Sequence, residues 1–169
     1  MSVKYPLEDL LRVRKFREDA AANQLTHCRR AVEAAVRLVE ERKRALKEYT
    51  EWRIQREAEL YQEVLKQEVQ LRALDDLKLK ILELREREFA YQKQIHDAEQ
   101  ELQKAKAALE QAHRDYQEAL RNTEKIDEHK GIWTEEMQKL IEELEEKELE
   151  DFHVRVLDDG ESDGESDDA

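Results

Sequence analysis

The side chains that could do chemistry are few and scattered. No histidine has another four residues away, which is the helical spacing that would hold a metal between two rings. There is no glycine-rich phosphate loop, no His-Glu-x-x-His zinc motif and no Gly-x-Ser-x-Gly nucleophile turn. We therefore predict no metal, no cofactor and no enzymatic activity. The lone cysteine, Cys28, falls at an apolar helical position and is interpreted as a small core residue. The histidines are His27, His96, His113, His129 and His153.

Carboxylates are abundant, but they form a charged surface rather than a catalytic pair. The chain has 43 Asp and Glu against 30 Lys and Arg, for a net charge of −13. Residues 127–169 alone carry 18 acidic and 4 basic side chains. Phosphate binding needs a clustered positive face, so we predict no nucleic-acid partner.

The same composition argues against the membrane. The longest uncharged run, AAANQLTHC at 20–28, is far shorter than the roughly 20 apolar residues that cross a bilayer. The first residues lack the apolar core of a signal peptide. An acidic surface also does not suit an interfacial helix. We expect a cytoplasmic protein without direct membrane insertion, whose function depends on a binding surface, a scaffold or a mechanical element.

The elements that position these side chains are predicted to be long helices. No glycine or proline occurs between Pro6 and Gly131. A compact domain of this length would need about ten to fifteen turns, most of them marked by Gly, Pro, Asn or Asp. Richness in Ala, Glu, Lys, Leu and Arg is typical of coiled coils. We therefore predict an all-α fold.

Two apolar seams with coiled-coil spacing support this fold. In the first seam, nine of twelve positions are apolar and the exceptions are arginines. In the second, twelve of fourteen are apolar, and Glu88 and Thr123 interrupt it. The first seam comprises Ala21, Leu25, Cys28, Val32, Ala35, Val39, Arg42, Leu46, Tyr49, Arg53, Arg56 and Leu60. The apolar positions of the second are Ile81, Leu84, Tyr91, Ile95, Ala98, Leu102, Ala105, Leu109, Ala112, Tyr116, Ala119 and Ile126.

The seam phase fails between Leu60 and Ile81, so the chain is predicted to turn there. Asp75 or Asp76 could cap the second helix. The fold class is thus a long antiparallel two-helix coiled-coil hairpin with a disordered acidic C-terminal tail. Its expected segments are an extended N-terminus at 1–6, a helix at 7–66, a turn at 67–76, a helix at 77–152 and the tail at 153–169. The alternative is one continuous helix that dimerises in parallel.

A hairpin would bring the polar breaks of the two seams together. Arg53 and Arg56 would lie opposite Glu86 and Glu88, in a polar layer that fixes the helix register. The basic residues at 12–17 would lie beside the acidic end of the second helix, where local charge pairing is one interpretation of them.

The stretch EHKGIWTEE, at 128–136, is unusual in a chain built for helix. Gly131 is the only glycine before the last ten residues. We expect it to allow a bend or a close approach, at a cost of about 1 kcal/mol relative to alanine. Trp133 is predicted to pack opposite an apolar patch at 7–16. Met137, Leu140, Ile141 and Leu144 continue its apolar stripe.

Two segments resemble a known family. KYPLEDLLRVRKFRED at 4–19 and KIDEHKGIWTEEMQKLIEELEEKELEDF at 125–152 are similar to the central-stalk proteins of bacterial type III secretion, the YscO family, with flagellar FliJ proteins as more distant relatives. The shared features are an opening Tyr-Pro-Leu and a His-Lys-x-x-Trp element, here His129, Lys130 and Trp133, followed by a Glu/Lys-rich run. The DGES tail departs from the family pattern.

The resemblance implies a stalk that docks in the pore of a hexameric secretion ATPase, promotes its assembly and activity and couples it to a membrane export gate through the cytosolic part of that gate. It also implies binding of secretion chaperones and a location at the inner-membrane face. The alternative is a structural coiled-coil tether or filament protein. The candidate ATPase contacts are Arg12, Arg14, Lys15, Arg17, Lys130 and Trp133. The candidate gate contacts, near the turn, are Lys66, Arg72, Lys78 and Lys80.

Overall fold

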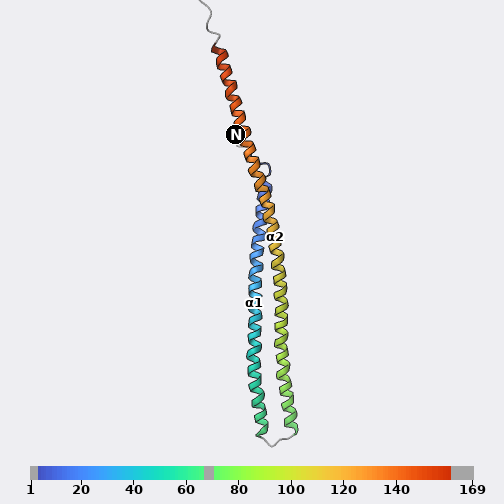
Figure 1. Cartoon of the computed structure of the whole chain (residues 1–169). Helices are drawn as coiled ribbons and strands as arrows, with labels where there is room; N and C mark the ends of the chain where they lie inside the picture. Colours follow the sequence, from blue (N-terminus) through green and yellow to red (C-terminus); the bar gives the residue numbers. More distant parts are fainter. Residues whose placement is uncertain (1–3, 67–70, 161–169) are drawn as a thin grey trace, which may run out of the picture. The chain divides into compact units, whose positions relative to one another are not determined.

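The chain folds as a helical hairpin (Figure 1). The computed structural model describes residues 4–66 and 71–160. Over these residues it contains two helices, α1 (Glu8–Leu65) and α2 (Leu71–Gly160), and no strand. The predicted all-α, two-helix fold is therefore confirmed, and the chain folds back on itself rather than forming one continuous helix. No helix of the described ranges has an apolar stretch that could cross a membrane.

The hairpin divides into two compact units, which are described separately. Unit 1 combines Met1–Asp19 with Glu118–Ala169, and unit 2 is Ala20–Gln117. In each unit a segment of α1 runs antiparallel to a segment of α2. In unit 1 the ion pair Lys15–Asp127 joins the helices at 3.5 Å, and in unit 2 Lys43–Glu99 joins them at 2.9 Å.

A proline turn starts α1. The Glu8 amide donates a hydrogen bond to the Tyr5 carbonyl oxygen over 3.3 Å, which closes a four-residue turn around Pro6 and Leu7. Proline favours the second position of such a turn because its ring fixes φ. Of the predicted extended segment 1–6, residues 1–3 lie outside the described residues, and Pro6 belongs to this turn.

The second helix begins earlier than predicted, at Leu71 rather than at residue 77. Residues 67–70 of the predicted turn lie outside the described part of the chain, and residues 71–76 are helical. Asp75 and Asp76 therefore lie inside α2 instead of capping it. The helix starts before them because Leu-Arg-Ala-Leu, at 71–74, is a sequence that favours helix.

The second helix also ends later than predicted, at Gly160 rather than at residue 152. Residues 153–160, expected to be disordered, continue the helix. Negative charge at a helix C-terminus is unfavourable. However, extending an existing helix requires no new nucleation, and no glycine or proline precedes Gly160 in this stretch. Residues 161–169 of the predicted tail lie outside the described residues.

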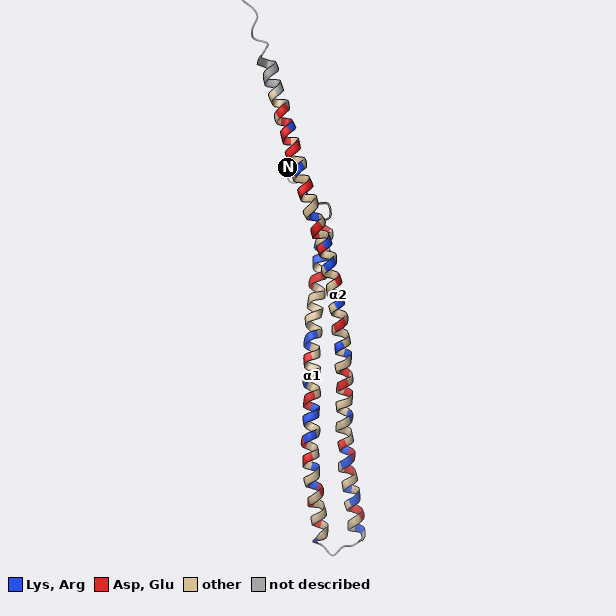
Figure 2. Cartoon of the chain, in the orientation of Figure 1, with Lys and Arg blue, Asp and Glu red and all other residues tan. Residues whose placement is uncertain are grey.

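The core consists mostly of seam residues, and Val64 and Leu77, from the stretch in which the predicted seam phase failed, extend it. In unit 2, Leu60, Leu77, Ile81 and Leu84 form one buried cluster, with Val64 packed against it. A second cluster is formed by Leu25, Cys28 and Ala112, with Leu109 and Tyr116 packed against it. Cys28 is buried, in agreement with its interpretation as a core residue. Charged residues of both signs occur along both helices (Figure 2).

The seam can be tested with two leucines of one helix. Leu77 is 6% exposed, whereas Leu79 is 64% exposed. We expect Leu77→Ala to lower the free energy of unfolding by about 2–3 kcal/mol, because it removes buried methyl groups and leaves a cavity. Leu79→Ala should stay within about 0.5 kcal/mol of the wild type. Urea unfolding measures the stability of both variants. Equal losses of stability would contradict the assignment of Leu77 to the buried seam.

Candidate functional site

A cluster of side chains joins the start of α1 to α2 in unit 1. We call Tyr5, Glu8, His129, Lys130 and Trp133 the terminal clamp. Tyr5 is only 5% exposed. Its hydroxyl lies 2.8 Å from Nδ1 of His129, in a hydrogen bond whose donor depends on the histidine tautomer. Its ring centroid lies 5.3 Å from that of Trp133, with the planes inclined at 59°. This tilted arrangement is one that aromatic pairs favour.

The local sequence explains how the clamp forms. The turn at Pro6 directs the chain before α1 back along the hairpin, so that Tyr5 reaches α2. On α2, His129 and Trp133 are four residues apart and so share one helical face. The Tyr-Pro-Leu and His-Lys-x-x-Trp motifs, 124 residues apart at the Tyr5–His129 contact, are therefore two halves of one cluster.

Opposite charges reinforce the clamp. The Nζ atom of Lys130 lies 2.7 Å from a Glu8 carboxylate oxygen and 5.9 Å from the centroid of the Tyr5 ring. The hydrogen bond from Lys130 lowers the pKa of Glu8 below its ordinary value. Lys130 thus ties α2 to the first residue of α1, a role that helical spacing alone would not have revealed.

Tyr5 is the functional residue that sequence reasoning missed. We expected Trp133 to pack on the apolar patch at 7–16, but its aromatic contact is with Tyr5, before the helix begins. Within the patch, Leu11 is buried while Phe16 is 74% exposed. An aromatic residue directly before Pro6 and a helix start was the available signal, because residues that precede a helix often pack back onto it.

The close approach that we expected at Gly131 is not found among the described residues. A Cβ atom built on it meets nothing within 4 Å among the described neighbours, and its φ angle is not positive. The glycine therefore permits no close approach within the described chain, and α2 continues through it without a break.

The other candidate ATPase contacts lie on the first turns of α1. Arg12 and Arg17 are exposed, and Arg14 is half-buried. Arg12 lies 3.7 Å from Asp9 of its own helix, and Lys15 pairs with Asp127. Among the described side chains, no ion pair joins this basic group to the acidic residues at 142–150. The expected pairing with that run is absent there because α2 continues past the start of α1.

The candidate gate contacts lie next to the turn in unit 2. All four side chains are exposed. They are Lys66, directly after α1, and Arg72, Lys78 and Lys80 of α2. One of them, Lys80, lines a small open pocket between the helices together with Glu63, Asp76 and Leu77. Over the described residues, no three histidine, cysteine or acidic side chains are grouped to hold a metal ion.

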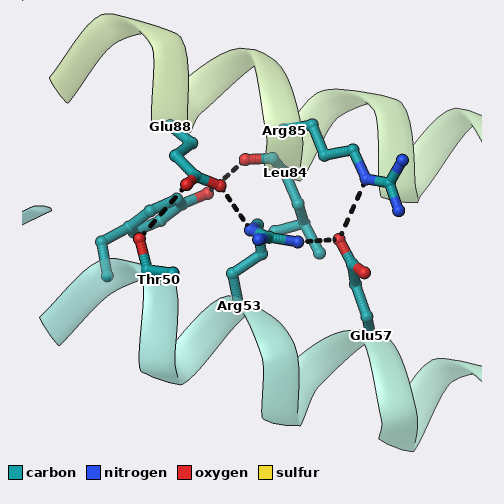
Figure 3. A network of polar contacts seen from close by, with 7 residues as sticks. Thr50, Arg53, Glu57, Leu84, Arg85 and Glu88 are labelled. Atoms are coloured by element: carbon teal, nitrogen blue, oxygen red, sulfur yellow. Dashed lines mark hydrogen bonds and ion pairs between the residues drawn. The ribbon is translucent and has the colours of Figure 1, made fainter. Parts of the chain in front are cut away.

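A polar layer crosses the seam in unit 2 (Figure 3). Arg53 is at its centre, with its side chain 16% exposed. One terminal nitrogen lies 2.6 Å from Glu57 on the same helix, and Nε lies 2.6 Å from Glu88 on the other. Nε is buried and makes no well-aligned hydrogen bond, so its contact with Glu88 is mainly electrostatic. Glu88 also accepts a hydrogen bond from Thr50 over 3.3 Å.

The layer contains only half of its predicted members. The structure brings Arg53 and Glu88 together across the helices. Arg56 instead pairs with Glu59 and Glu63 on its own helix, and Glu86 is exposed. Arg56 is held by the carboxylates of its own helix, and Glu86 lies two residues from the seam positions Leu84 and Glu88, on an outer face of α2.

Glu57 and Arg85 complete the layer, with Arg85 Nε lying 3.4 Å from a Glu57 oxygen. Neither residue occupies a seam position, so the apolar repeat gave no sign of them. Next to them the Tyr49 hydroxyl donates to the Leu84 carbonyl oxygen over 2.8 Å, and its ring stacks on Tyr91 with centroids 4.8 Å apart.

The layer shifts two pKa values. Burial raises the pKa of the Glu57 carboxyl, but hydrogen bonds from Arg53 and Arg85 outweigh it, and the net shift is downward. The hydrogen bond to Glu57 in turn raises the pKa of Arg53. Both shifts favour the charged forms, so the layer is ionic at neutral pH.

Comparisons with known proteins identify the family of this two-helix chain. The family model described as "Type III secretion protein YscO" matches residues 7–155. The chain belongs to the YscO family. The resemblance is thereby confirmed, over a range that includes all of α1, α2 as far as residue 155, and every member of the terminal clamp except Tyr5. No curated protein matches the chain in sequence.

Two solved structures are similar to this YscO-family chain. The crystal structure at 2.8 Å of the type III secretion protein YscO from Vibrio parahaemolyticus has 25% sequence identity and a TM-score of 0.78, and covers 86% of this chain and 92% of that one. CT670 from Chlamydia trachomatis, described as a YscO homologue, has 22% identity and a TM-score of 0.75, with 96% and 99% covered. The two-helix fold of the YscO-family chain is thus shared.

The polar layer can be tested by removing its central charge. Arg53→Leu should lower the free energy of unfolding by about 1–3 kcal/mol, because Glu57 and Glu88 would lose the guanidinium that compensates their burial. Arg56→Leu is the matched control, since Arg56 pairs only within α1, and should change stability by less than about 0.5 kcal/mol. Chemical unfolding of both variants measures these changes. An Arg53→Leu variant as stable as the wild type would contradict the structural role of the layer.

The lowered pKa of Glu57 predicts a pH dependence. A carboxyl group with a depressed folded-state pKa stabilises the fold above its ordinary value of 4.5. That contribution is lost as the pH falls below 4.5 and through the folded-state pKa. Wild type should therefore lose more stability than Glu57→Gln over this acidic range. Unfolding curves recorded at a series of pH values test this, and parallel profiles would refute it.

Proposed function

We propose that this chain is the central stalk of a type III secretion apparatus. It docks in the pore of the hexameric secretion ATPase, promotes the assembly and activity of the hexamer and couples it to the cytosolic part of the membrane export gate. It also binds the chaperones that escort exported proteins, and it works in the cytoplasm at the inner-membrane face. Membership of the YscO family is the observation that carries the proposal.

Two features support an ATPase contact in unit 1. Arg12, Lys15 and Arg17 are exposed on α1, and exposed positive charge can steer association with an acidic surface. Trp133 is half-buried against Tyr5, which leaves part of a large aromatic face accessible. Tryptophan and arginine are the residue types that most often dominate binding energy at protein interfaces.

Exposed charge near the turn supports a second contact, with the export gate. Lys66, Arg72, Lys78 and Lys80 belong to unit 2, whereas the residues of the terminal clamp belong to unit 1. The proposal therefore assigns the two partners to separate groups of residues, and the two contacts can be tested independently.

The test uses the cognate secretion ATPase and paired charge reversals. Arg12→Glu with Arg17→Glu should reduce both ATPase stimulation and hexamer formation, and leave gate binding unchanged. Lys78→Glu with Lys80→Glu should reduce gate binding and leave ATPase stimulation and hexamer formation unchanged. If wild type changes neither ATPase turnover nor hexamer assembly, the stalk role fails and the structural tether is favoured.

The two tryptophans give a second, matched comparison. Trp133→Ala should weaken ATPase binding at least about tenfold, equivalent to 1.4 kcal/mol. Trp52→Ala removes a tryptophan that is 47% exposed in unit 2 and should leave ATPase binding unchanged. Circular dichroism confirms that both variants remain helical. Unaltered affinity after Trp133→Ala would remove that residue from the interface.

A further inference from the structure

The α2 helix continues past the terminal clamp as a single helix. Tyr5 contacts His129 and Trp133, and α1 begins at Glu8. Beyond Trp133, α2 runs on to Gly160, and no described residue of α1 accompanies it (Figure 1, orange to red). We call residues 134–153 the overhang. At 1.5 Å per residue it is about 30 Å long, enough for a helical binding site.

The overhang carries an apolar stripe that continues the face of α2 which, before Trp133, packs against α1. Met137, Leu140, Ile141 and Leu144 follow Trp133 at intervals of three and four residues, so all lie on one side of the helix. Leu140 is 46% exposed and Leu144 is 52% exposed. We call these four residues the overhang stripe. It prolongs the seam of the hairpin where the hairpin itself supplies no second helix.

Acidic residues surround the overhang stripe. Residues 134–153 contain nine acidic side chains and two lysines, and this part of α2 shows more red than blue in Figure 2. Glu136 and Glu143 lie to one side of the stripe and Glu145 to the other, by their helical spacing. Across the described residues, no lysine or arginine forms an ion pair with any of these carboxylates. The negative charge is therefore not neutralised within the described fold.

This charge decides between possible occupants. A second copy pairing through the same stripe would place two acidic flanks against each other, which costs free energy. The C-terminal residues DGESDGESDDA are acidic as well and would be repelled in the same way. A partner with basic flanks would neutralise the carboxylates and cover the apolar residues at once.

We propose that the overhang stripe binds an amphipathic helix of a partner protein whose apolar residues repeat at intervals of three and four and whose flanks carry lysine and arginine. This helix takes the position beside α2 that α1 occupies as far as the clamp, and it extends the seam as a two-protein coiled coil. The inference rests on the overhang alone and does not depend on the ATPase role.

The test titrates two synthetic helical peptides of three heptads into the whole protein. Both carry leucine and isoleucine at seam positions. One has lysine and arginine flanks, and the other has glutamate flanks. Isothermal calorimetry should detect binding of the basic peptide only, and binding should weaken as salt is raised because the flanking charges are screened.

Variants locate the binding on the stripe. Leu140→Gln with Leu144→Gln should weaken binding of the basic peptide at least about tenfold. Glutamine preserves helix propensity, so the overhang stays helical. Leu149→Gln is the matched control, because Leu149 is 65% exposed on another face of the same helix, and it should bind as wild type does.

Three results would overturn the inference. The first is equal binding of the two peptides, and the second is equal binding by the stripe variant and the Leu149 control. The third is a doubled mass in light scattering that the stripe variant abolishes, because a second copy would then be the occupant.

Discussion

Within the described residues, each helix of this hairpin packs against one other helix, so only one face of each helix is shielded from water. The consequence is a thin core. Among the described side chains none is less than 2% exposed, and large apolar residues such as Phe16 and Phe89 are more than two-thirds exposed. The hydrophobic effect therefore stabilises the pairing along a narrow seam. Every other property of the fold, including the alignment of the helices, has to be specified by contacts at the edges of that seam.

Apolar repeats alone align two helices poorly, because sliding one helix by seven residues again places apolar residues opposite each other. In unit 2 such a slide would place Arg53 opposite Ile81 or Ile95, so that it keeps Glu57 of its own helix but loses the facing carboxylate of Glu88. The Arg53–Glu88 contact thus penalises the wrong alignments. In unit 1 the terminal clamp has a similar effect, since Tyr5 has one position in which it meets both His129 and Trp133.

The sequence was informative where one periodic signal determined the outcome. The seams predicted the burial of Leu25, Cys28 and Ala112 and the antiparallel pairing of the helices. Thr123, which interrupts the repeat, is buried all the same, because its hydroxyl donates to the Ala119 carbonyl oxygen of its own helix. Periodicity could not reveal Arg85, whose long side chain reaches the layer from outside the seam, or Tyr5, which precedes the helix. Helix ends were also missed, since they depend on local free energies that differ little from one residue to the next.

The clamp also affects how the protein is made. Tyr5 and His129 are 124 residues apart in the sequence. At 5–20 residues per second, a ribosome needs roughly 6–25 s to synthesise the intervening chain. Throughout that time the start of α1 lacks its partner segment of α2. Leu60, in contrast, can pack as soon as Leu77, which follows closely in the sequence, has been synthesised. Unit 2 can therefore form while synthesis continues, and the Tyr5 contact closes among the last. A chain truncated before Trp133 could not make the Tyr5–Trp133 contact. This contact therefore forms only after α2 has been synthesised past the clamp.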